Sequence, residues 1–368
     1  MKNVLMTASV LAFAAGSAVA GGIERSTQST AILFENADNY LEFNFGAVNP
    51  SVSGTAIPAL GGFGSGDMAG NYKSLSFGYK KALTDKLDLA IIYDQPLGAD
   101  VNYAAGTNYV IQGSTAEIKS DSLTALMRYK MPQNVSLIGG VRALRTSGVA
   151  DLNVFVPGIG PTPYALQSTK ETDFGYVLGV AWEKPEIAAR VSLTYNSAIT
   201  HNFTALSESS LVPGADDQFE TEVPQSVNLD FQTGIAANTL LFGSVRWVDW
   251  SAFKLDPKGY SATYGDPLVY YDNDVVTYSL GLGRKFNENW SGAIMYGYEK
   301  SAGDPTGNLG PTDGFKSYGI AATYTQENVK ITGGVRYVDI GDATTRVYNS
   351  SFTDNKGWGA GIRIGYSF

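Results

Sequence analysis

The chain has 368 residues, among them 42 glycines and 22 tyrosines, but no cysteine and a single histidine. This composition excludes a disulfide framework, a thiolate nucleophile and a metal centre built from Cys and His. The formal net charge of −9 argues against a nucleic-acid partner, because phosphate binding needs clustered lysines and arginines. We therefore expect no enzyme activity, no catalytic residue, and no metal or cofactor.

Residues 1–20 have the three parts of a cleaved export signal. Lys2 provides the positive start, Val4 to Ala15 form an apolar stretch, and Ala18-Val19-Ala20 form the cleavage site. The mature chain is expected to begin at Gly21. No later run reaches the roughly 18 apolar residues of a membrane-spanning helix. Because no cysteine follows the signal, a bacterial lipid anchor is excluded, which leaves a soluble protein or a β-barrel.

From residue 40 onward, apolar and polar residues alternate strictly, as they do in strands. The final segment, 358–368, is apolar at one parity and small or polar at the other. Alternation also fits a soluble sandwich, but here tyrosine and tryptophan recur near the strand ends on the apolar parity. This placement is typical of the aromatic girdles of a membrane barrel, and the polar parity suits its lumen.

The pattern predicts an all-β fold, a 14-stranded antiparallel transmembrane β-barrel over residues 40–368. Short polar turns alternate with long loops, which places both termini on the periplasmic side of an outer-membrane barrel. The sheet must close, because lipid cannot satisfy the backbone groups of a free edge. The expected strands lie near 40–48, 72–80, 86–94, 117–130, 134–146, 170–183, 187–202, 223–236, 239–250, 273–286, 289–300, 314–325, 328–340 and 355–368.

Four stretches make the sequence resemble the FadL-type family of outer-membrane transporters for long-chain fatty acids and other hydrophobic compounds. They are Val223-Pro224-Gln225-Ser226, Arg246 to Phe253, Tyr278 to Gly283 with Asn289-Trp290, and Phe45 to Gly54. The resemblance implies a barrel plugged by an amino-terminal hatch, with a kink in the third strand that opens the wall toward the membrane.

The kink of the family maps to Asp94 to Gly98 in this chain. Pro96 lacks a backbone donor and Gly98 lacks a side chain to pack, so pairing is expected to weaken around Leu97. An ordinary strand end is the alternative, because Pro and Gly also punctuate strand ends.

The hatch is short in this sequence. Residues 21–39 precede the first strand, and the family's Asn-Pro-Ala motif is missing. The segment still contains the apolar run from Ala31 to Phe34 and the charged Glu24 and Arg25. We expect it to lie inside the barrel and contact a ligand, with inward Arg128, Arg142, Arg190 and Arg336 as partners; a frayed terminus is the alternative.

Apolar residues in two predicted outer loops are candidates for the first contact with a hydrophobic substrate. Loop 1 offers Ile57, Leu60 and Phe63, and loop 3 offers Val154, Phe155, Val156, Ile159 and Leu166. The predicted site is thus Pro96, Leu97 and Gly98 with Phe34, Phe63, Phe155 and Arg25, which could meet a carboxylate. His201 lacks the partners of an acyl-transfer site and is interpreted as an exposed loop or girdle residue.

Two functions remain open on these residues. The first is a transporter that binds hydrophobic molecules in the barrel and releases them sideways through the strand 3 kink. The second is a general diffusion porin or structural barrel with a water-filled lumen, which the short hatch and the many small inward residues favour. In either case we expect a monomer in contact with outer-membrane lipid and lipopolysaccharide. The sequence leaves fatty acids and uncharged compounds as alternative substrates.

Overall fold

A computed structural model describes residues 22–27, 29–156, 159–209 and 218–368. The predicted export signal lies outside these residues. Strands β1 (Asn39–Ser51) and β23 (Asn355–Ser367) pair with each other, and β1 also pairs with β3 (Tyr72–Thr84), so the sheet closes on itself. The result is an antiparallel barrel of 14 strands, as predicted.

Eighteen strand segments make up the wall, because four barrel strands are interrupted along their length. Besides β1, β3 and β23, the wall segments are β4 (Leu87–Asp94), β5 (Gly98–Asn102), β6 (Thr115–Lys130), β7 (Val135–Val156), β8 (Gly160–Ser168), β9 (Glu171–Lys184), β10 (Ala189–Asn196), β11 (Ile199–Glu208), β12 (Gln218–Val223), β13 (Ser226–Ala236), β14 (Thr239–Val248), β17 (Val275–Lys285), β18 (Trp290–Glu299), β19 (Phe315–Gln326) and β20 (Val329–Ile340). The four interrupted strands are β4 with β5, β8 with β9, β10 with β11, and β12 with β13.

The prediction of loop 3 was wrong. Residues 147–169 were expected to form a loop, but β7 continues to Val156 and pairs with β8 from Val149↔Gln167 to Val156↔Gly160. Pro161 and Pro163 lie within β8 opposite Phe155 and Asn153. These prolines gave a turn signal, yet a proline is tolerated where its missing N–H is not needed by the ladder. Val154, Phe155, Val156 and Leu166 are therefore strand residues that extend the wall, and only Ile159 lies in the turn.

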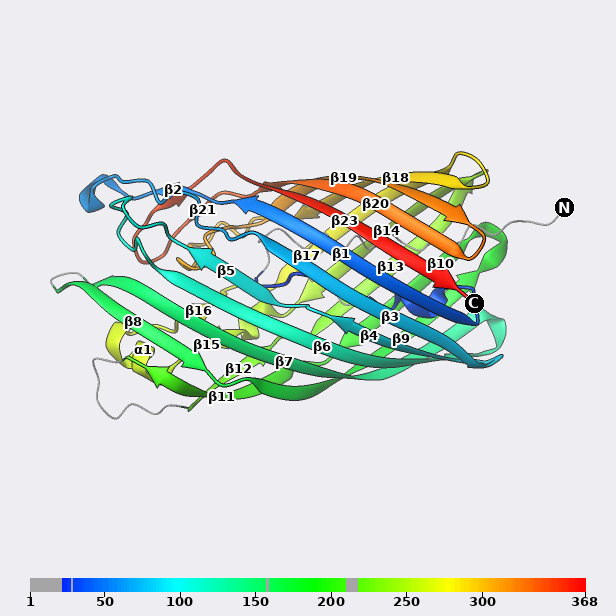
Figure 1. Cartoon of the computed structure of the whole chain (residues 1–368), viewed down its shortest axis with the longest axis horizontal. Helices are drawn as coiled ribbons and strands as arrows, with labels where there is room; N and C mark the ends of the chain where they lie inside the picture. The colour runs from blue at the N-terminus through cyan, green and yellow to red at the C-terminus, as the bar shows by residue number, and fades with distance from the viewer. Residues whose placement is uncertain (1–21, 28, 157–158, 210–217) are drawn as a thin grey trace.

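The two ends of the barrel differ, as Figure 1 shows. At the end that carries the C-terminus, tight turns include left-handed residues such as Gln133, Ala188, Asn238 and Glu327. The opposite end carries long loops with their own small elements. The small elements of the long loops are β2 (Gly54–Thr55), η2 (Pro58–Leu60), η5 (Trp250–Ala252), β15 (Lys254–Leu255), α1 (Lys258–Tyr264), β16 (Val269–Tyr270), β21 (Ala343–Thr344) and β22 (Ser351–Phe352). The 3₁₀ helices η3 (Pro132–Asn134) and η4 (Pro185–Ile187) lie in tight turns at the other end, and η1 (Ala31–Phe34) precedes β1.

The burial pattern of the wall is the reverse of that in a water-soluble protein. Large apolar side chains face outward, including Val141, Ile294 and Ile320, each about 60% exposed. Charged and polar side chains of the same strands point inward and are buried, among them Arg128 and Arg142. A continuous apolar outer band with a polar interior is the pattern of a barrel immersed in lipid.

Aromatic residues border this band at both ends. Trp290 and Tyr324 pair near the short turns, with ring centroids 5.0 Å apart. Tyr337 and Trp358 pair at the same distance near the long loops. The two predicted girdles thus occupy opposite rims. In the described part of the chain, no helix is long and apolar enough to cross a membrane.

Candidate functional site

The wall is broken between β3 and the strand formed by β4 and β5. β3 pairs with β4 from Phe77↔Tyr93 toward the short turns, but Tyr72 to Ser76 of β3 have no register partner in β4 or β5. β5 pairs with β6 on its other side. Gln95 spans the break, where its Oε1 accepts a hydrogen bond of 3.3 Å from the Leu75 N–H. We call this break the wall gap.

The wall gap lies at the predicted kink, Asp94 to Gly98, where strand pairing stops between β4 and β5. Leu97 no longer faces β3, and its backbone N–H and C=O are both bonded to the Ser120 hydroxyl of β6, at 2.9 and 2.7 Å. Its side chain turns inward and is 4% exposed. Pro96 has no N–H to offer a ladder, so a break at this position leaves fewer donors unsatisfied than a break elsewhere. The observed geometry favours the kink over an ordinary strand end, because pairing with β6 resumes in β5.

The amino-terminal segment lies inside the barrel and pairs with the kink. Pro96 O accepts hydrogen bonds from the N–H groups of Arg25 at 2.7 Å and Ser26 at 3.2 Å, and Gly98 N–H donates to Ile23 O at 2.9 Å. Residues 23–26 therefore occupy the backbone positions that a regular neighbour would have filled. We call Ile23 to Ser26 the upper plug segment.

A bidentate ion pair fixes the upper plug segment to the opposite wall. Arg246 of β14 donates to both carboxylate oxygens of Glu24, at 3.1 and 2.6 Å. Both side chains are less than a tenth exposed. Arg246 also donates from Nη1 to Ser226 Oγ and Asn228 Oδ1, so four of its five N–H groups have partners. Beside this pair, the Arg25 guanidinium lies 4.4 Å from the centre of the Tyr72 ring.

The second part of the plug is the 3₁₀ helix η1, whose Ile32, Leu33 and Phe34 are nearly fully buried. The Phe34 ring lies against two guanidinium groups, those of Arg128 at 4.2 Å and Arg190 at 4.3 Å. Arg128 also donates to Leu33 O and forms an ion pair with Glu183. Two of the four inward arginines expected to meet the plug thus contact this segment, Ala31 to Phe34, which we call the lower plug segment.

Three cavities surround the plug in the described part of the structure. The outer cavity, of about 140 Å³, lies between the upper plug segment, β5 and the long loops. The inner cavity, of about 80 Å³, lies below Ser26 and is lined by Ser74, Leu75, Ser76 and Gln95 at the wall gap. The kink cavity, of about 40 Å³, is apolar and lies between Leu97, Ile23 and Phe253. Ile23 lines both the outer and the kink cavity.

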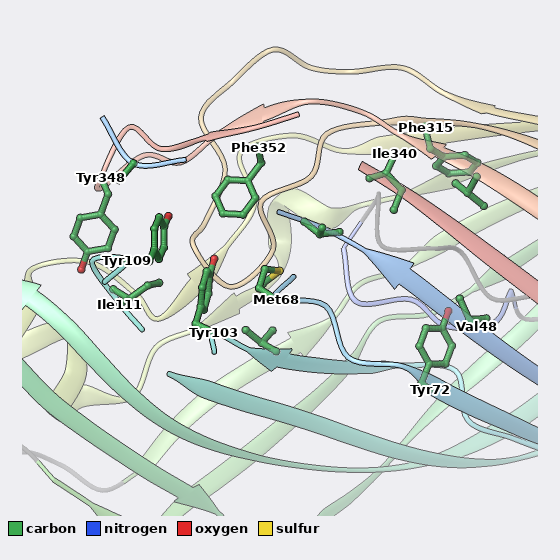
Figure 2. Close-up of a cluster of buried hydrophobic side chains, with 14 residues drawn as sticks. Val48, Met68, Tyr72, Tyr103, Tyr109, Ile111, Phe315, Ile340, Tyr348 and Phe352 are labelled. Atoms are coloured by element: carbon green, nitrogen blue, oxygen red, sulfur yellow. The ribbon is translucent and has the colours of Figure 1, made fainter. Parts of the chain in front are cut away.

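Aromatic loop residues form a buried cluster that reaches the outer cavity through Met68. Figure 2 shows Tyr103, Tyr109, Tyr348 and Phe352 gathered with Met68. The rings of Tyr103 and Tyr109 stack at 5.4 Å. Burial raises the pKa of Tyr348 to about 12, so its hydroxyl stays neutral. That hydroxyl accepts a hydrogen bond of 3.0 Å from the Phe155 N–H, and the loops thereby join the end of β7.

The structure brings some of the predicted site residues together. Arg25 and Gly98 line the outer cavity, Leu97 lines the kink cavity, and Pro96 joins the plug to the wall through its carbonyl. A Cβ added to Gly98 would lie 2.5 Å from Arg25 Nε, so the absent side chain leaves room for the plug.

Phe34, Phe63 and Phe155 lie apart from the cavities. Phe34 is packed into the lower plug segment, whereas Phe63 is 42% exposed in the loop after β1, with its ring against Gly61. Phe155 packs against the aromatic cluster of Figure 2 from the end of β7. None of them lines the three cavities described above.

His201 differs from its interpretation as an exposed residue. It points inward from β11 and is fully buried. Its Nδ1 lies 2.7 Å from Asp173 Oδ2 and its Nε2 lies 3.2 Å from Thr146 Oγ1. In β10 the odd-numbered residues such as Val191 and Leu193 face outward, but the break at residues 197–198 reverses this parity, so His201 of β11 points inward. Its aspartate partner comes from another strand, which the sequence order did not reveal.

Acidic residues line the outer cavity more often than basic ones. Asp272, Asp274, Asp304 and Asp313 face Arg25, Lys300 and Arg346 there, and Arg346 is paired with Asp272 at 3.1 Å. Within the described residues, no three His, Cys, Asp or Glu side chains lie close enough together to hold a metal ion.

Comparison with known proteins identifies the fold. No family model and no curated protein sequence matches the chain. Among solved structures, it is similar to a FadL homologue from Pseudomonas aeruginosa, with a TM-score of 0.70, 15% identity, and coverage of 97% of this chain and 98% of that one. The toluene transporter TodX of Pseudomonas putida has a TM-score of 0.63 and 12% identity over 95% and 96% of the two chains. The toluene transporter TbuX of Ralstonia pickettii has a TM-score of 0.60 and 12% identity over 97% of both. The fold is therefore that of the FadL-type barrels, as the sequence resemblance implied.

Proposed function

We propose that this protein is an outer-membrane channel that takes up small, uncharged hydrophobic molecules and releases them sideways into the membrane through the wall gap. The observation that carries the proposal is the unpaired stretch of β3, Tyr72 to Ser76, opposite the kinked strand. An unpaired strand edge is unfavourable in lipid, and such a break is retained where a function requires it. Structural neighbours named as toluene transporters have the same fold.

The cavities define a route with two steps. A molecule that passes the long loops reaches the outer cavity, whose volume is close to the roughly 150 Å³ of an engineered cavity that binds benzene. The upper plug segment separates this space from the inner cavity, which borders the gap. Transfer therefore requires Ile23 to Ser26 to move away from the kink.

The charge around the outer cavity supports an uncharged substrate. Five aspartates and two glutamates line it against three cationic side chains, and one of these cations is already paired with Asp272. A carboxylate substrate would meet net repulsion in this space, whereas a neutral ring would not. The fatty acids that the family resemblance allowed are thus a weaker fit than neutral aromatic or aliphatic compounds.

The diffusion porin is the alternative. The plug and the buried inward arginines occupy the lumen at the level of Phe34, which argues against a wide aqueous channel. We expect the purified protein to show no large, steady ion current in a planar bilayer. A current typical of an open porin would favour the alternative.

A reversible crosslink across the wall gap tests lateral release. Continuing the β3–β4 register by two residues places Leu75 opposite Gln95, and the native chain has no cysteine to interfere. In the Leu75→Cys/Gln95→Cys variant, oxidation should sharply reduce the uptake of radiolabelled toluene by cells that depend on this protein. A thiol reductant should restore it.

The matched control is Ile294→Cys/Ile320→Cys, an outward pair in register across the intact β18–β19 ladder. Its oxidation should leave uptake unchanged. Undiminished uptake by the oxidised gap variant, at equal surface abundance and with the disulfide confirmed, would contradict lateral release.

A further inference from the structure

The kink cavity combines an apolar lining with a small polar wall. Three aromatic side chains line it, those of Phe203 in β11, Phe219 in β12 and Phe253 between η5 and β15. Phe203 and Phe219 stack at 5.4 Å, and the ring centroid of Phe203 is also 5.4 Å from that of His201. Thr146, His201 and Thr221 line the same cavity. A flat apolar group with one polar end therefore matches its surroundings.

The polar wall includes a hydrogen-bond chain that ends in an acceptor. We assign the Nδ1–H tautomer to His201, because Asp173 Oδ2 at 2.7 Å is an acceptor; Nε2 then accepts from the Thr146 hydroxyl at 3.2 Å. While the Thr146 hydroxyl donates its hydrogen bond to His201, its oxygen retains lone pairs that can accept another hydrogen bond. A ligand donor would satisfy them.

The neighbouring Thr221 provides a donor without a partner. It lies opposite His201 in the β11–β12 register and is 4% exposed. Its Oγ1 has no hydrogen-bond partner among the described residues. A buried hydroxyl without a partner is unfavourable, and rotation about its Cα–Cβ bond can present this one to the cavity that the residue lines.

From these contacts we propose that the kink cavity binds the hydroxyl end of an uncharged aromatic compound, a phenol or aromatic alcohol. The ligand hydroxyl donates to Thr146 Oγ1 and accepts from Thr221 Oγ1, and its ring lies beside Ile23. A hydrocarbon satisfies neither group. A carboxylate has no proton for Thr146 and brings a second negative charge toward Asp173.

Because the kink cavity is small, the ligand can bind there only after Ile23 has moved. At about 40 Å³, the kink cavity is too small for an aromatic ring. Among the plug residues 22–27, Ile23 is the one that lines both this cavity and the outer cavity of about 140 Å³. Displacement of Ile23 joins the two spaces. The ligand would then lie against Leu97 of the kink, which connects recognition to the wall gap. The inference therefore rests on the proposed function and specifies its substrate class.

Two nearly isosteric probes test the inference, p-cresol and p-xylene, which differ by a hydroxyl in place of a methyl group. Equilibrium dialysis of the radiolabelled compounds compares proteoliposomes with protein-free liposomes, which corrects for partition into lipid. In the wild-type protein, p-cresol should bind at least as tightly as p-xylene. The Thr221→Val variant should shift the ratio of the two dissociation constants about tenfold toward p-xylene, the effect of losing one buried hydrogen bond.

Two further variants keep the experiment interpretable. Thr221→Ser retains the hydroxyl and should retain the wild-type ratio. Thr194→Val removes another buried hydroxyl without a partner among the described residues, from β10 and outside the three cavities, and should also leave the ratio unchanged. An unchanged ratio in Thr221→Val would overturn the inference, as would a wild-type protein that binds p-xylene but not p-cresol. Toluene uptake that depends on the wall gap would then still support the proposed function, whereas its absence would contradict that function separately.

Discussion

The two plug segments are held in the barrel by different interactions. The upper segment, Ile23 to Ser26, is bound through backbone hydrogen bonds to the kink and the ion pair of Glu24 with Arg246. The lower segment, Ala31 to Phe34, is bound by burial of three apolar side chains and by two arginines against one ring. Hydrogen bonds exchange readily for contacts with a ligand or water, whereas apolar burial does not. The comparison suggests a movable upper segment and a fixed lower seal.

Removal of both segments should have the largest effect. Deletion of Glu24 to Asn36 removes the plug and leaves every barrel strand intact. We expect the permeability to small hydrophilic solutes to rise by about tenfold or more, as in barrels with a water-filled lumen. Swelling of liposomes in arabinose or an antibiotic measures the change, with heat modifiability as the check that the barrel has assembled.

If the parent protein is already as permeable as this deletion variant, the plug does not seal the lumen, and the result supports the diffusion porin instead. If neither protein admits solutes, the loops or inward side chains close the barrel instead.

Phe34→Ala should have an intermediate effect, confined to the lower seal. The substitution removes a buried ring and its contacts with Arg128 and Arg190, a loss of about 3–5 kcal/mol for a well-packed aromatic residue. Hydrophilic solutes should leak, and hydrogen exchange around Leu33 should accelerate. Phe34→Leu is the matched variant, because it keeps most of the volume and should leak less. Equal solute exclusion by Phe34→Ala and the wild type would show that the lower segment is not the seal.

Glu24→Gln should have the smallest effect on permeability, because it loosens the upper plug segment and leaves the lower one in place. It preserves the shape of the side chain but removes the charge that Arg246 binds, at a cost of about 1–3 kcal/mol. We expect faster hydrogen exchange at Arg25 and Ser26 and faster toluene uptake, without a leak of hydrophilic solutes. Glu186→Gln, at an exposed turn, is the control. A leak as large as that of Phe34→Ala would remove the distinction between the two segments.

Much of the barrel could be predicted because its rules are local. Lipid on one face and polar groups on the other impose a period of two on each strand, and this period is visible in the sequence. The same pattern failed at residues 147–169, where Pro161 and Pro163 resemble a loop although β7 and β8 continue the wall. A proline in the sequence shows only that one backbone N–H is missing. Whether the adjacent strand needs that N–H for a hydrogen bond depends on how the two strands pair.

The site was predictable only in part. Pro96 and Gly98 indicated where pairing would weaken, and the apolar run at residues 31–34 indicated a segment that needed burial. The partners of both came from distant parts of the chain: Glu24 meets Arg246, and His201 lies between Asp173 and Thr146. Composition and alternation cannot reveal such contacts, because they depend on which strands face each other across the lumen.

By itself, the sequence determined the class of fold, the number of barrel strands and the positions of the short turns, since each depends on residues that are near neighbours in the chain; the family resemblance added the place of the kink. Only the tertiary structure decided that the short plug binds the kink, that Phe34 packs between two arginines, and that His201 borders a cavity. Closure of the barrel brings side chains from opposite walls within hydrogen-bonding distance, and that proximity has no signature in local sequence.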